Sequence, residues 1–399
     1  MVILMKILGI VAEYNPFHNG HLYHLKKSLE YTNAEATVVV MSGNFIQRGE
    51  PALLDKFTRA DTAVKNGIDL VIELPLYYSV ATAETFSYGA VKLLSECGVK
   101  FLSFGAETNN LEKLKNIASL LSNEPTSYSA ELKKQLETGI SYPEARSNTV
   151  SKLLGISNNI LTKPNNILAV EYLKALYSLN PNIEPVLIDR VDSGYHDTDS
   201  NTNILSATGI REKLKNNEDI DLYVPEITLN YIKTPIFIEN FEENIMYALR
   251  KMSLENIKDL PDVTEGLENR ILYALSYSKS LSELIDNIKT KRYPMTRVKR
   301  ILMSALLDIS KTNLNTFNSI GGPLYIRVLS FNEKGRELLS EISATSSLPI
   351  ITSVNKFLEK ATELQKEMLL ADILATNIYT LATKEKTMNL DFLRRLKNV

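Results

Sequence analysis

The sequence is poor in cysteine, in long apolar runs and in net charge, and each shortage excludes a class of protein. Its one cysteine, Cys97, allows neither a disulfide framework nor a metal site built from several thiolates, and we expect a buried thiol there. A membrane-spanning helix needs about 20 consecutive apolar residues, and no apolar run in this sequence approaches that length. A net charge of −2 gives no overall electrostatic footprint for nucleic acid, so a polyanion would have to bind a local basic patch.

The apolar N-terminal segment is interrupted by Lys6 and Glu13 and lacks the basic start and small-residue cleavage site of a signal peptide. We therefore interpret it as a strand. These features predict a cytoplasmic protein that has neither a membrane nor DNA as a partner.

The first half of the chain alternates strand-like and helix-like segments. A hydrophobic content of 44% and a charged content of 23% are typical of a globular protein, and 399 residues suffice for two or three domains. Unbroken apolar strands separated by helices predict a Rossmann-like α/β fold, with a parallel sheet covered on both faces. Strands are expected at 7–12, 38–41, 69–74, 101–105 and 185–188, and helices at 55–66, 82–96 and over most of 109–180, broken at Pro143 and Pro164.

The pattern changes near residue 220. Long amphipathic helical patterns such as 242–258 and 298–314 dominate from there, and little strand signal is left except near 324–331. We therefore predict a Rossmann-like domain at 1–218 and a mainly α-helical C-terminal domain at 219–399.

Three of the four histidines follow the first expected strand. Residues 13–24 read Glu-Tyr-Asn-Pro-Phe-His-Asn-Gly-His-Leu-Tyr-His, where Asn-Pro marks a turn and His18 opens an expected helix. The free N–H groups and the positive dipole of a helix start attract phosphate, and imidazoles add hydrogen bonds. His18 and His21 share a helix face, and Gly20 lets the backbone approach a ligand closely. This layout predicts an ATP site.

Two alternatives compete with that interpretation. The histidines could form a hydrogen-bonded pair in the core, or they could bind zinc together with His196 or a nearby carboxylate. The segment lacks the His-Glu-x-x-His pattern of many zinc sites, and we expect no metal site.

Two further segments are expected to face the same ligand. In Ser206–Arg211, hydroxyls can cap a helix start and face phosphate, and Arg211 adds a fixed positive charge one turn later. This signal is weak alone, because serine and threonine cap most helices. A second group of residues comes from three separate places: Gly105 and Asp189-Arg190 at the ends of expected strands, and Asn165-Asn166 after Pro164. Open α/β sheets bind ligands at the carboxyl ends of their strands. Loop asparagines and a surface arginine are the alternative interpretation of these residues.

A basic segment interrupts the otherwise slightly acidic chain. Residues 289–300 contain six lysines and arginines, no acidic residue and one aromatic residue, Tyr293. Basic side chains with an interleaved aromatic ring suit RNA phosphates and bases. A solvated helix start is the alternative, but the density of positive charge favours contact with a polyanion.

These motifs resemble those of a known family. His-x-Gly-His with Ser-Ala-Thr-x-Ile-Arg is similar to the paired signatures of the nucleotidylyltransferase superfamily, whose fold is of the HUP type. Together with residues 42–51, 164–168, 193–197 and 290–297, they resemble the bacterial tRNA(Met) cytidine acetate ligases. The resemblance is collinear from about residue 6 to about residue 335.

The resemblance implies a two-step reaction. ATP activates acetate as acetyl-adenylate and pyrophosphate leaves; the N4 amine of the wobble cytidine, C34 of elongator tRNA(Met), then takes the acetyl group. Mg²⁺ is expected with the triphosphate. We expect His18 and His21 to act in catalysis by stabilising the phosphates, with help from Arg211, and Lys291, Arg292 and Arg297 to bind tRNA. The implied ATP-binding residues are Val11, Ala12, Glu13, Tyr14, Asn15, Pro16, Phe17, His18, Asn19, Gly20, His21, Leu22, Tyr23, His24, Gly105, Asn165 and Arg190.

Two other functions share part of the pattern. A small-metabolite adenylyltransferase would have the first two signatures but would not need a large helical part with a basic segment. A non-catalytic RNA-binding protein would not need intact histidine, glycine and Ser/Thr-x-Ile-Arg elements. No motif identifies a base for the cytidine amine.

Overall fold

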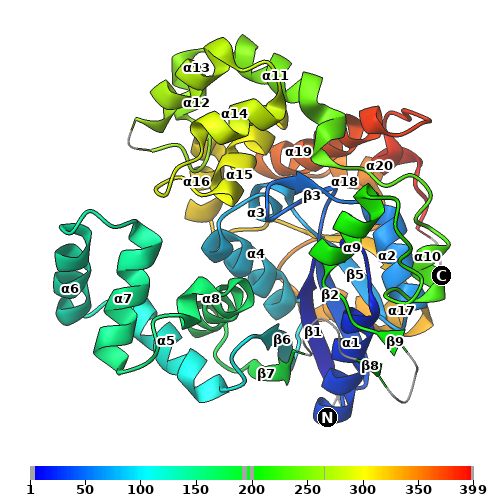
Figure 1. Ribbon diagram of the computed structural model, residues 1–399. Coiled ribbons are helices and arrows are strands. Elements are labelled where there is room, and N and C mark those ends of the chain that lie inside the picture. The colour runs from blue at the N-terminus through cyan, green and yellow to red at the C-terminus, as the bar shows by residue number, and fades with distance from the viewer. Residues whose placement is uncertain (1–4, 191–195, 198–201, 265, 397–399) are drawn as a thin grey trace.

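The computed structural model describes the chain except residues 1–4, 191–195, 198–201, 265 and 397–399 (Figure 1). Among the described residues, seven strands form one sheet in the order β11-β10-β5-β2-β1-β6-β7. The strands β5, β2, β1, β6 and β7 are parallel; β10 runs antiparallel to β5, and β11 parallel to β10. Their bounds are β1 (Ile7–Ala12), β2 (Ala36–Ser42), β5 (Leu70–Leu74), β6 (Phe101–Ala106), β7 (Glu184–Asp189), β10 (Ile326–Phe331) and β11 (Ile350–Ile351). The predicted Rossmann-like α/β class is confirmed, as are its five predicted strands.

Helices cover both faces of the sheet. Successive side chains of a strand point to opposite faces, so an unbroken apolar strand has two apolar faces that must be buried. In β2, Val38 and Val40 belong to one apolar core, whereas Val39 and Met41 belong to the other. The first core includes residues of α4 (Ala83–Glu96) and α8 (Pro164–Leu179). The second includes residues of α1 (Asn19–Thr32) and α2 (Lys56–Lys65). Cys97 is buried, as the sequence predicts.

A group of helices between β6 and β7 extends to one side of the sheet (Figure 1). It consists of α5 (Leu111–Asn123), α6 (Thr126–Leu136), α7 (Tyr142–Leu154), a 3₁₀ turn at Ile160–Thr162 and α8. Pro143 and Pro164 lie in the first turns of α7 and α8, where a missing N–H costs no helical hydrogen bond. The prolines thus separate helices by starting the next one.

The C-terminal half is mainly helical, as predicted, but its helices are shorter than the sequence pattern suggests. The predicted helices at 242–258 and 298–314 are each interrupted, because Ser253 and Ser310 cap new helices. The helices are α9 (Ala207–Lys215), α10 (Glu226–Leu229), α11 (Glu242–Lys251), α12 (Leu254–Lys258), α13 (Leu267–Tyr277), α14 (Leu281–Ile288), α15 (Met295–Leu306), α16 (Lys311–Ser319), α17 (Glu333–Thr345), α18 (Val354–Leu358), α19 (Glu363–Tyr379) and α20 (Leu390–Leu393).

Short elements complete the fold. They are α3 (Leu76–Ser79), the ribbon of β3 (Phe45–Ile46) with β4 (Glu50–Pro51), the ribbon of β8 (His196–Asp197) with β9 (Thr202–Asn203), and 3₁₀ turns at Ile238–Phe241 and Thr380–Ala382. Within the described ranges, no helix combines the length and the apolar character needed to cross a membrane.

The sheet extends across the predicted domain boundary. Strands β10 and β11 come from the C-terminal half, yet β10 pairs with β5 of the N-terminal half. The division at 218/219 remains a prediction, and the two halves share one sheet.

Four buried charges hold these two halves together. Lys56 on α2 lies 2.8 Å from both the Glu73 and the Asp391 carboxylates. Arg327 on β10 contacts the same two carboxylates, with 3.2 Å between its Nη1 and Glu73 Oε2. The four side chains are at most 3% exposed and alternate in sign, so they form a closed ring of ion pairs. We call them the charge ring.

Removing one carboxylate from the charge ring should strongly destabilise the protein. In Asp391→Ala, Lys56 and Arg327 would share Glu73, which leaves one buried positive charge uncompensated; we expect a loss of about 3–5 kcal/mol in the free energy of unfolding. Urea unfolding of the variant measures this loss.

Arg394→Ala is the matched control, because it breaks an ion pair with Asp61 that is partly exposed, and about 1 kcal/mol or less is expected from it. Equal losses in the two variants would contradict a special role of the ring.

Candidate active site

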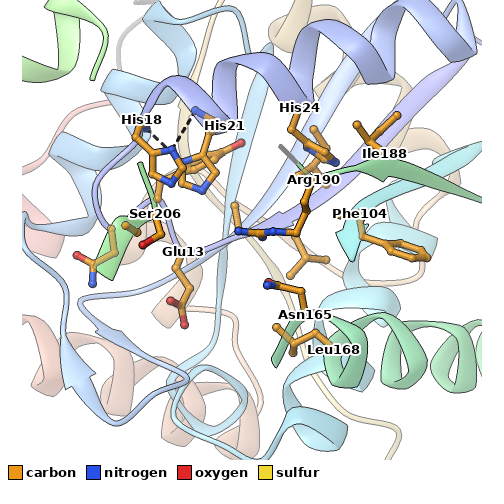
Figure 2. Close-up of a pocket in the computed structure, with 18 of the residues that line it drawn as sticks. Glu13, His18, His21, His24, Phe104, Asn165, Leu168, Ile188, Arg190 and Ser206 are labelled. Atoms are coloured by element: carbon orange, nitrogen blue, oxygen red, sulfur yellow. Dashed lines mark hydrogen bonds between the residues drawn. The ribbon is translucent and has the colours of Figure 1, made fainter. Parts of the chain in front are cut away.

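A cavity of about 420 Å³ opens at the carboxyl ends of β1, β6 and β7 (Figure 2). In the sheet, β1 lies between β2 and β6, so the chain proceeds from β1 to one side and later returns to the other. Such a reversal of strand order creates the crevice where open α/β sheets bind ligands. The volume falls in the range of small-molecule sites.

The rings of His18 and His21 pack against each other at the start of α1. His18 is the N-cap residue, and its Nδ1 accepts the N–H of Gly20 at 3.0 Å. The Nδ1 of His21 accepts the N–H of His18 at 3.2 Å, and the two ring centroids lie 3.8 Å apart. Because each Nδ1 is an acceptor, each neutral ring carries its proton on Nε2. The pair can therefore offer two N–H donors to an anion.

Gly20 is required for this packing. A Cβ at position 20 would lie 2.9 Å from Cε1 of His18, closer than real Cβ contacts. Because glycine leaves this space free, the His18 ring can bend back over the first turn of α1 and cap it.

The imidazoles are uncharged near neutral pH. Burial, assisted by the positive charges of Arg190 and Arg211, lowers the pKa of His18 to about 3. Burial and then the charge of His18 lower the pKa of His21 well below its ordinary value. Phosphate oxygens would reverse part of this effect, since a nearby negative charge favours the imidazolium form.

His24 has a different local role. Ser28 Oγ donates to the backbone carbonyl of His24 at 2.7 Å and lies 2.7 Å from Ser103 Oγ. With its one proton donated, Ser28 can only accept from Ser103, which in turn accepts from His24 Nε2 at 3.0 Å. This chain of hydrogen bonds ties α1 to β6, and burial lowers the pKa of His24 to about 4.

Ser206 lines the cavity, whereas Arg211 lies behind its wall. Ser206 caps α9 by accepting the N–H of Gly209 and lines the cavity. Arg211 is absent from the described wall: its Nη1 donates to the carbonyl of Asn15 at 2.9 Å, and its Nη2 donates to Thr208 Oγ1 at 3.3 Å. Arg211 therefore holds the turn between β1 and α1; its catalytic role stays a prediction.

The far end of the cavity brings together three predicted residues. Figure 2 shows Arg190 extending into the cavity from the end of β7, near Asn165. A Cβ at Gly105 would lie 3.1 Å from Cγ of Arg190, so glycine makes room for this arginine. Asn165 donates to Glu107 at 2.6 Å, which fixes it at the start of α8.

The structure gathers most of the predicted ATP-binding residues, whose function stays a prediction. Those on the cavity wall are Val11, Ala12, Glu13, Tyr14, Asn15, His18, Gly20, His21, Tyr23, His24, Gly105, Asn165 and Arg190. The remaining four, Pro16, Phe17, Asn19 and Leu22, are not part of that wall. Of these, Asn19 donates to the carbonyls of Asn203 and Leu222, which fixes the start of α1 against the chain beside α9.

The sequence interpretation assigned no role to Gln47 and Arg48, which also line the cavity. Both lie in the turn between β3 and β4, where no periodic pattern marks them. Their position within residues 42–51, one of the segments of the family resemblance, was the available signal. Arg48 is exposed and adds a positive charge at the cavity wall.

The three residues predicted to bind tRNA differ in their surroundings. Lys291 and Arg292 are exposed just before α15. The guanidinium of Arg297 donates to the carbonyl of Asp262 and to Thr264 Oγ1, and it packs 5.2 Å from the ring centre of Tyr293. Arg297 is therefore also part of the local structure.

A direct packing contact joins this basic segment to the cavity. A Cβ at Gly49 would lie 2.3 Å from the backbone nitrogen of Arg300, and its φ of +75° also favours glycine. The next residue, Glu50, pairs with Lys299 on α15 and lies 3.9 Å from Arg211. The β3–β4 turn thus contacts both α15 and the cavity.

Within the described part of the chain, no three His, Cys, Asp or Glu side chains are grouped so that they could hold a metal ion.

The motif at 193–197, which is one of the segments of the family resemblance, is only partly described. Residues 193–195 lie outside the described residues.

The neutral histidines should make the free protein less stable in mild acid. Unfolded histidines bind protons near pH 6.5, whereas native His18 and His24 do so only near pH 3 and 4. Well above pH 6.5 the histidines are neutral in both states and have no such effect. As the pH falls, the unfolded state binds protons that the native state does not, so the free energy of unfolding decreases by roughly 1 kcal/mol per histidine between pH 7 and 5.5.

Urea unfolding at a series of pH values measures this loss. The double variant His18→Asn, His21→Gln keeps side chains that can cap α1 and should show a shallower loss. A wild-type stability that does not change between pH 7 and 5.5 would contradict the prediction.

Comparisons with known proteins agree with this geometry. Residues 5–391 match the model of the family described as HIGH Nucleotidyl Transferase. The tRNA(Met) cytidine acetate ligase of Thermoanaerobacter sp. (strain X514) is 44% identical over 98% of this chain and 99% of its own. That of Alkaliphilus metalliredigens (strain QYMF) is 41% identical over 96% of both chains.

Solved structures show the same relationship. Thermotoga maritima TmcAL bound with alpha-thio ATP has a TM-score of 0.90 and 33% identity, covering 97% of this chain and 98% of that one. The apo form of the same protein has a TM-score of 0.91 and 33% identity, covering 98% and 99%. With this full-length similarity and the histidine pair at the start of α1, the chain belongs to the HIGH nucleotidyl transferase family and, within it, to the tRNA(Met) cytidine acetate ligases.

Proposed function

We propose that the protein activates acetate with ATP and acetylates N4 of the wobble cytidine, C34, of elongator tRNA(Met). The observation that carries the proposal is the pair of neutral imidazoles, whose Nε2–H groups lie at a helix start beside the cavity. The relatives named tRNA(Met) cytidine acetate ligase, at 40–44% identity, support the acceptor. We place the reaction in the cytoplasm, with tRNA and acetate as partners and neither a membrane nor DNA.

In the first step, an acetate oxygen attacks the α-phosphate of ATP. A new P–O bond forms, the bond to the β-phosphate oxygen breaks, and pyrophosphate leaves with the electron pair. Such an in-line displacement needs positioning and neutralisation of charge more than a protein nucleophile. His18 and His21 donate N–H groups to the phosphates, and Arg190 and Arg48 add positive charge at the wall.

Arg211 assists this step indirectly, because it fixes the carbonyl of Asn15 in the turn that precedes the histidines. Mg²⁺ would accompany the triphosphate, where it neutralises the charge of the leaving group. The chemistry of the wall fits this arrangement: it offers the exposed carboxylate of Asp189, and Mg²⁺ commonly keeps water and phosphate oxygens as most of its ligands.

In the second step, the tRNA brings its cytidine amine to the acetyl-adenylate. Lys291 and Arg292 are exposed before α15, and the β3–β4 turn connects α15 to the cavity. We therefore assign the basic segment to tRNA phosphates and the cavity to the adenylate. Arg297 contributes positive charge and also holds the segment in shape.

Alanine at His18 or His21 should abolish acetate-dependent release of pyrophosphate. Because alanine also removes a helix cap, the sharper variants are His18→Asn and His21→Gln, which can keep the cap but lack the imidazole N–H. We expect a fall of at least about 100-fold in acetate-dependent exchange of pyrophosphate into ATP, since each lost donor removes stabilisation of transition-state charge.

Melting temperatures close to that of the wild type would show that the variants are folded. Normal exchange in both variants would refute the assignment of the histidines.

Loss of basic side chains before α15 should weaken tRNA binding without changing adenylate formation. For Lys291→Ala and for Arg292→Ala, we expect the slope of log K against log salt to become shallower by about 1 each, because one phosphate contact is lost. Titration of labelled tRNA at several salt concentrations measures the slope. Arg297→Ala should weaken binding and lower stability as well, because its guanidinium contacts Asp262, Thr264 and Tyr293.

The decisive experiment is to incubate the protein with ATP, labelled acetate and bulk tRNA and to analyse the nucleosides. N4-acetylcytidine in tRNA is the expected product. A dinucleotide formed with another acceptor would indicate a small-metabolite adenylyltransferase, and no transfer to any acceptor would indicate a binding protein.

A further inference from the structure

We propose that Glu13 is the general base of the transfer step and accepts the proton that the cytidine amine loses as the acetyl group moves to it. The proposal rests on the proposed function. It starts from a side chain whose negative charge does not suit the binding of ATP or acetate.

Glu13 lines the cavity at the carboxyl end of β1. It follows β1 directly, at the place where the strand order reverses, and its side chain lines the wall below the histidine pair (Figure 2). Its Oε1 accepts the N–H of Gln47 at 3.0 Å. Among the described residues, no hydrogen-bond donor contacts Oε2. One oxygen therefore fixes the carboxylate, and the other is available to a substrate.

Arginines surround this carboxylate without pairing with it. The charges of Arg48, Arg59 and Arg211 all act on Glu13, yet within the described part of the chain none of them lies within the 4.0 Å of an ion pair with its carboxylate. Instead, Arg59 donates to the backbone carbonyl of Glu13, and Arg211 to that of Asn15. The carboxylate is thus held near positive charge but is not neutralised by a direct contact.

A carboxylate at this place opposes the first half of the reaction. ATP and acetate are both anions, and a negative group on the wall repels them. Glu13 lines the cavity, as the family resemblance implies, but its negative charge does not help to hold the phosphates. The transfer to an amine releases a proton, and a carboxylate can accept it.

The pKa of the group agrees with this role. Burial raises the pKa of Glu13 above its ordinary value, and the arginines offset only part of that effect. A carboxylate whose pKa is shifted toward neutrality is a stronger base than one on the surface. Asp189 is the other carboxylate on the wall, and it is exposed at the end of β7.

The N4 lone pair attacks the acetyl carbonyl carbon and forms the C–N bond, and the bond from that carbon to the phosphate oxygen breaks. AMP leaves with the electron pair, and the N–H proton passes to Oε2 of Glu13. The products are N4-acetylcytidine, AMP and a protonated Glu13, which releases its proton to water.

The test is to measure the two half-reactions separately in Glu13→Gln. Glutamine keeps an oxygen for the N–H of Gln47 and nearly the same volume, but it cannot take up the proton. We expect acetate-dependent exchange of pyrophosphate into ATP to stay within a few-fold of the wild type. Single-turnover transfer from preformed acetyl-adenylate to tRNA should fall by at least about 100-fold.

The pH profile and two further variants sharpen the test. The wild-type transfer rate should rise with pH and then level off, and Glu13→Gln should lose the rising limb. Glu13→Asp, which retains a base, should recover part of the transfer rate. Asp189→Asn is the comparison for the other carboxylate.

An unchanged transfer rate in Glu13→Gln, or equal losses of both half-reactions in that variant, would overturn the proposal. A selective loss of transfer in Asp189→Asn instead would assign the role of the base to the other carboxylate. Recovery of Glu13→Gln by excess Mg²⁺ would identify Glu13 as a metal ligand, which would also overturn the proposal. A wild-type protein without acetate-dependent exchange would refute the proposed function itself, and Glu13 would then have no transfer step to serve.

Discussion

The charge ring is the interaction on which the arrangement of this molecule depends. Lys56, Glu73, Arg327 and Asp391 come from α2, β5, β10 and α20, so two neighbouring elements of the N-terminal half meet two elements of the C-terminal half at one buried point. Burying four charges is tolerated because each has two partners of opposite sign. The ring fixes the last helix and the antiparallel strand to the sheet that carries the cavity.

The site itself uses backbone hydrogen bonds to control side-chain chemistry. Because Nδ1 of His18 and Nδ1 of His21 both accept N–H groups at the start of α1, the protonated nitrogen of each ring is fixed. Glu13 is oriented in the same way, by the N–H of Gln47. In each of these side chains, one polar atom makes a hydrogen bond to the backbone and the second polar atom is left for the ligand. The same few contacts therefore determine the local fold and the chemistry of the site.

Much of this was predictable from the sequence. The five parallel strands and the start of α1 were predicted because apolar runs, a turn and a capping position leave local signals. The role of Arg211 toward the carbonyl of Asn15 was not, since it depends on how two distant segments pack. The same holds for Arg297, whose guanidinium contacts Asp262 and Tyr293 within the helical part.

The places of β10 and of Arg48 were harder to predict. A short strand near 324–331 gives no indication that its partner is β5, more than 250 residues earlier in the chain. Arg48 lies in a turn without periodicity, and only the fold brings it to the cavity wall. Local patterns predicted elements, whereas long-range pairing decided which of them meet.

The pairing of β10 with β5 also limits how the gene could be divided. A chain ending near residue 218 would leave β5 as an open edge, with unpaired backbone groups that invite association with other chains. Lys56 and Glu73 would remain, without the partners that Arg327 and Asp391 provide. The nucleotide-binding half is therefore not a module that recombination could exchange by itself, and both halves have to be inherited together.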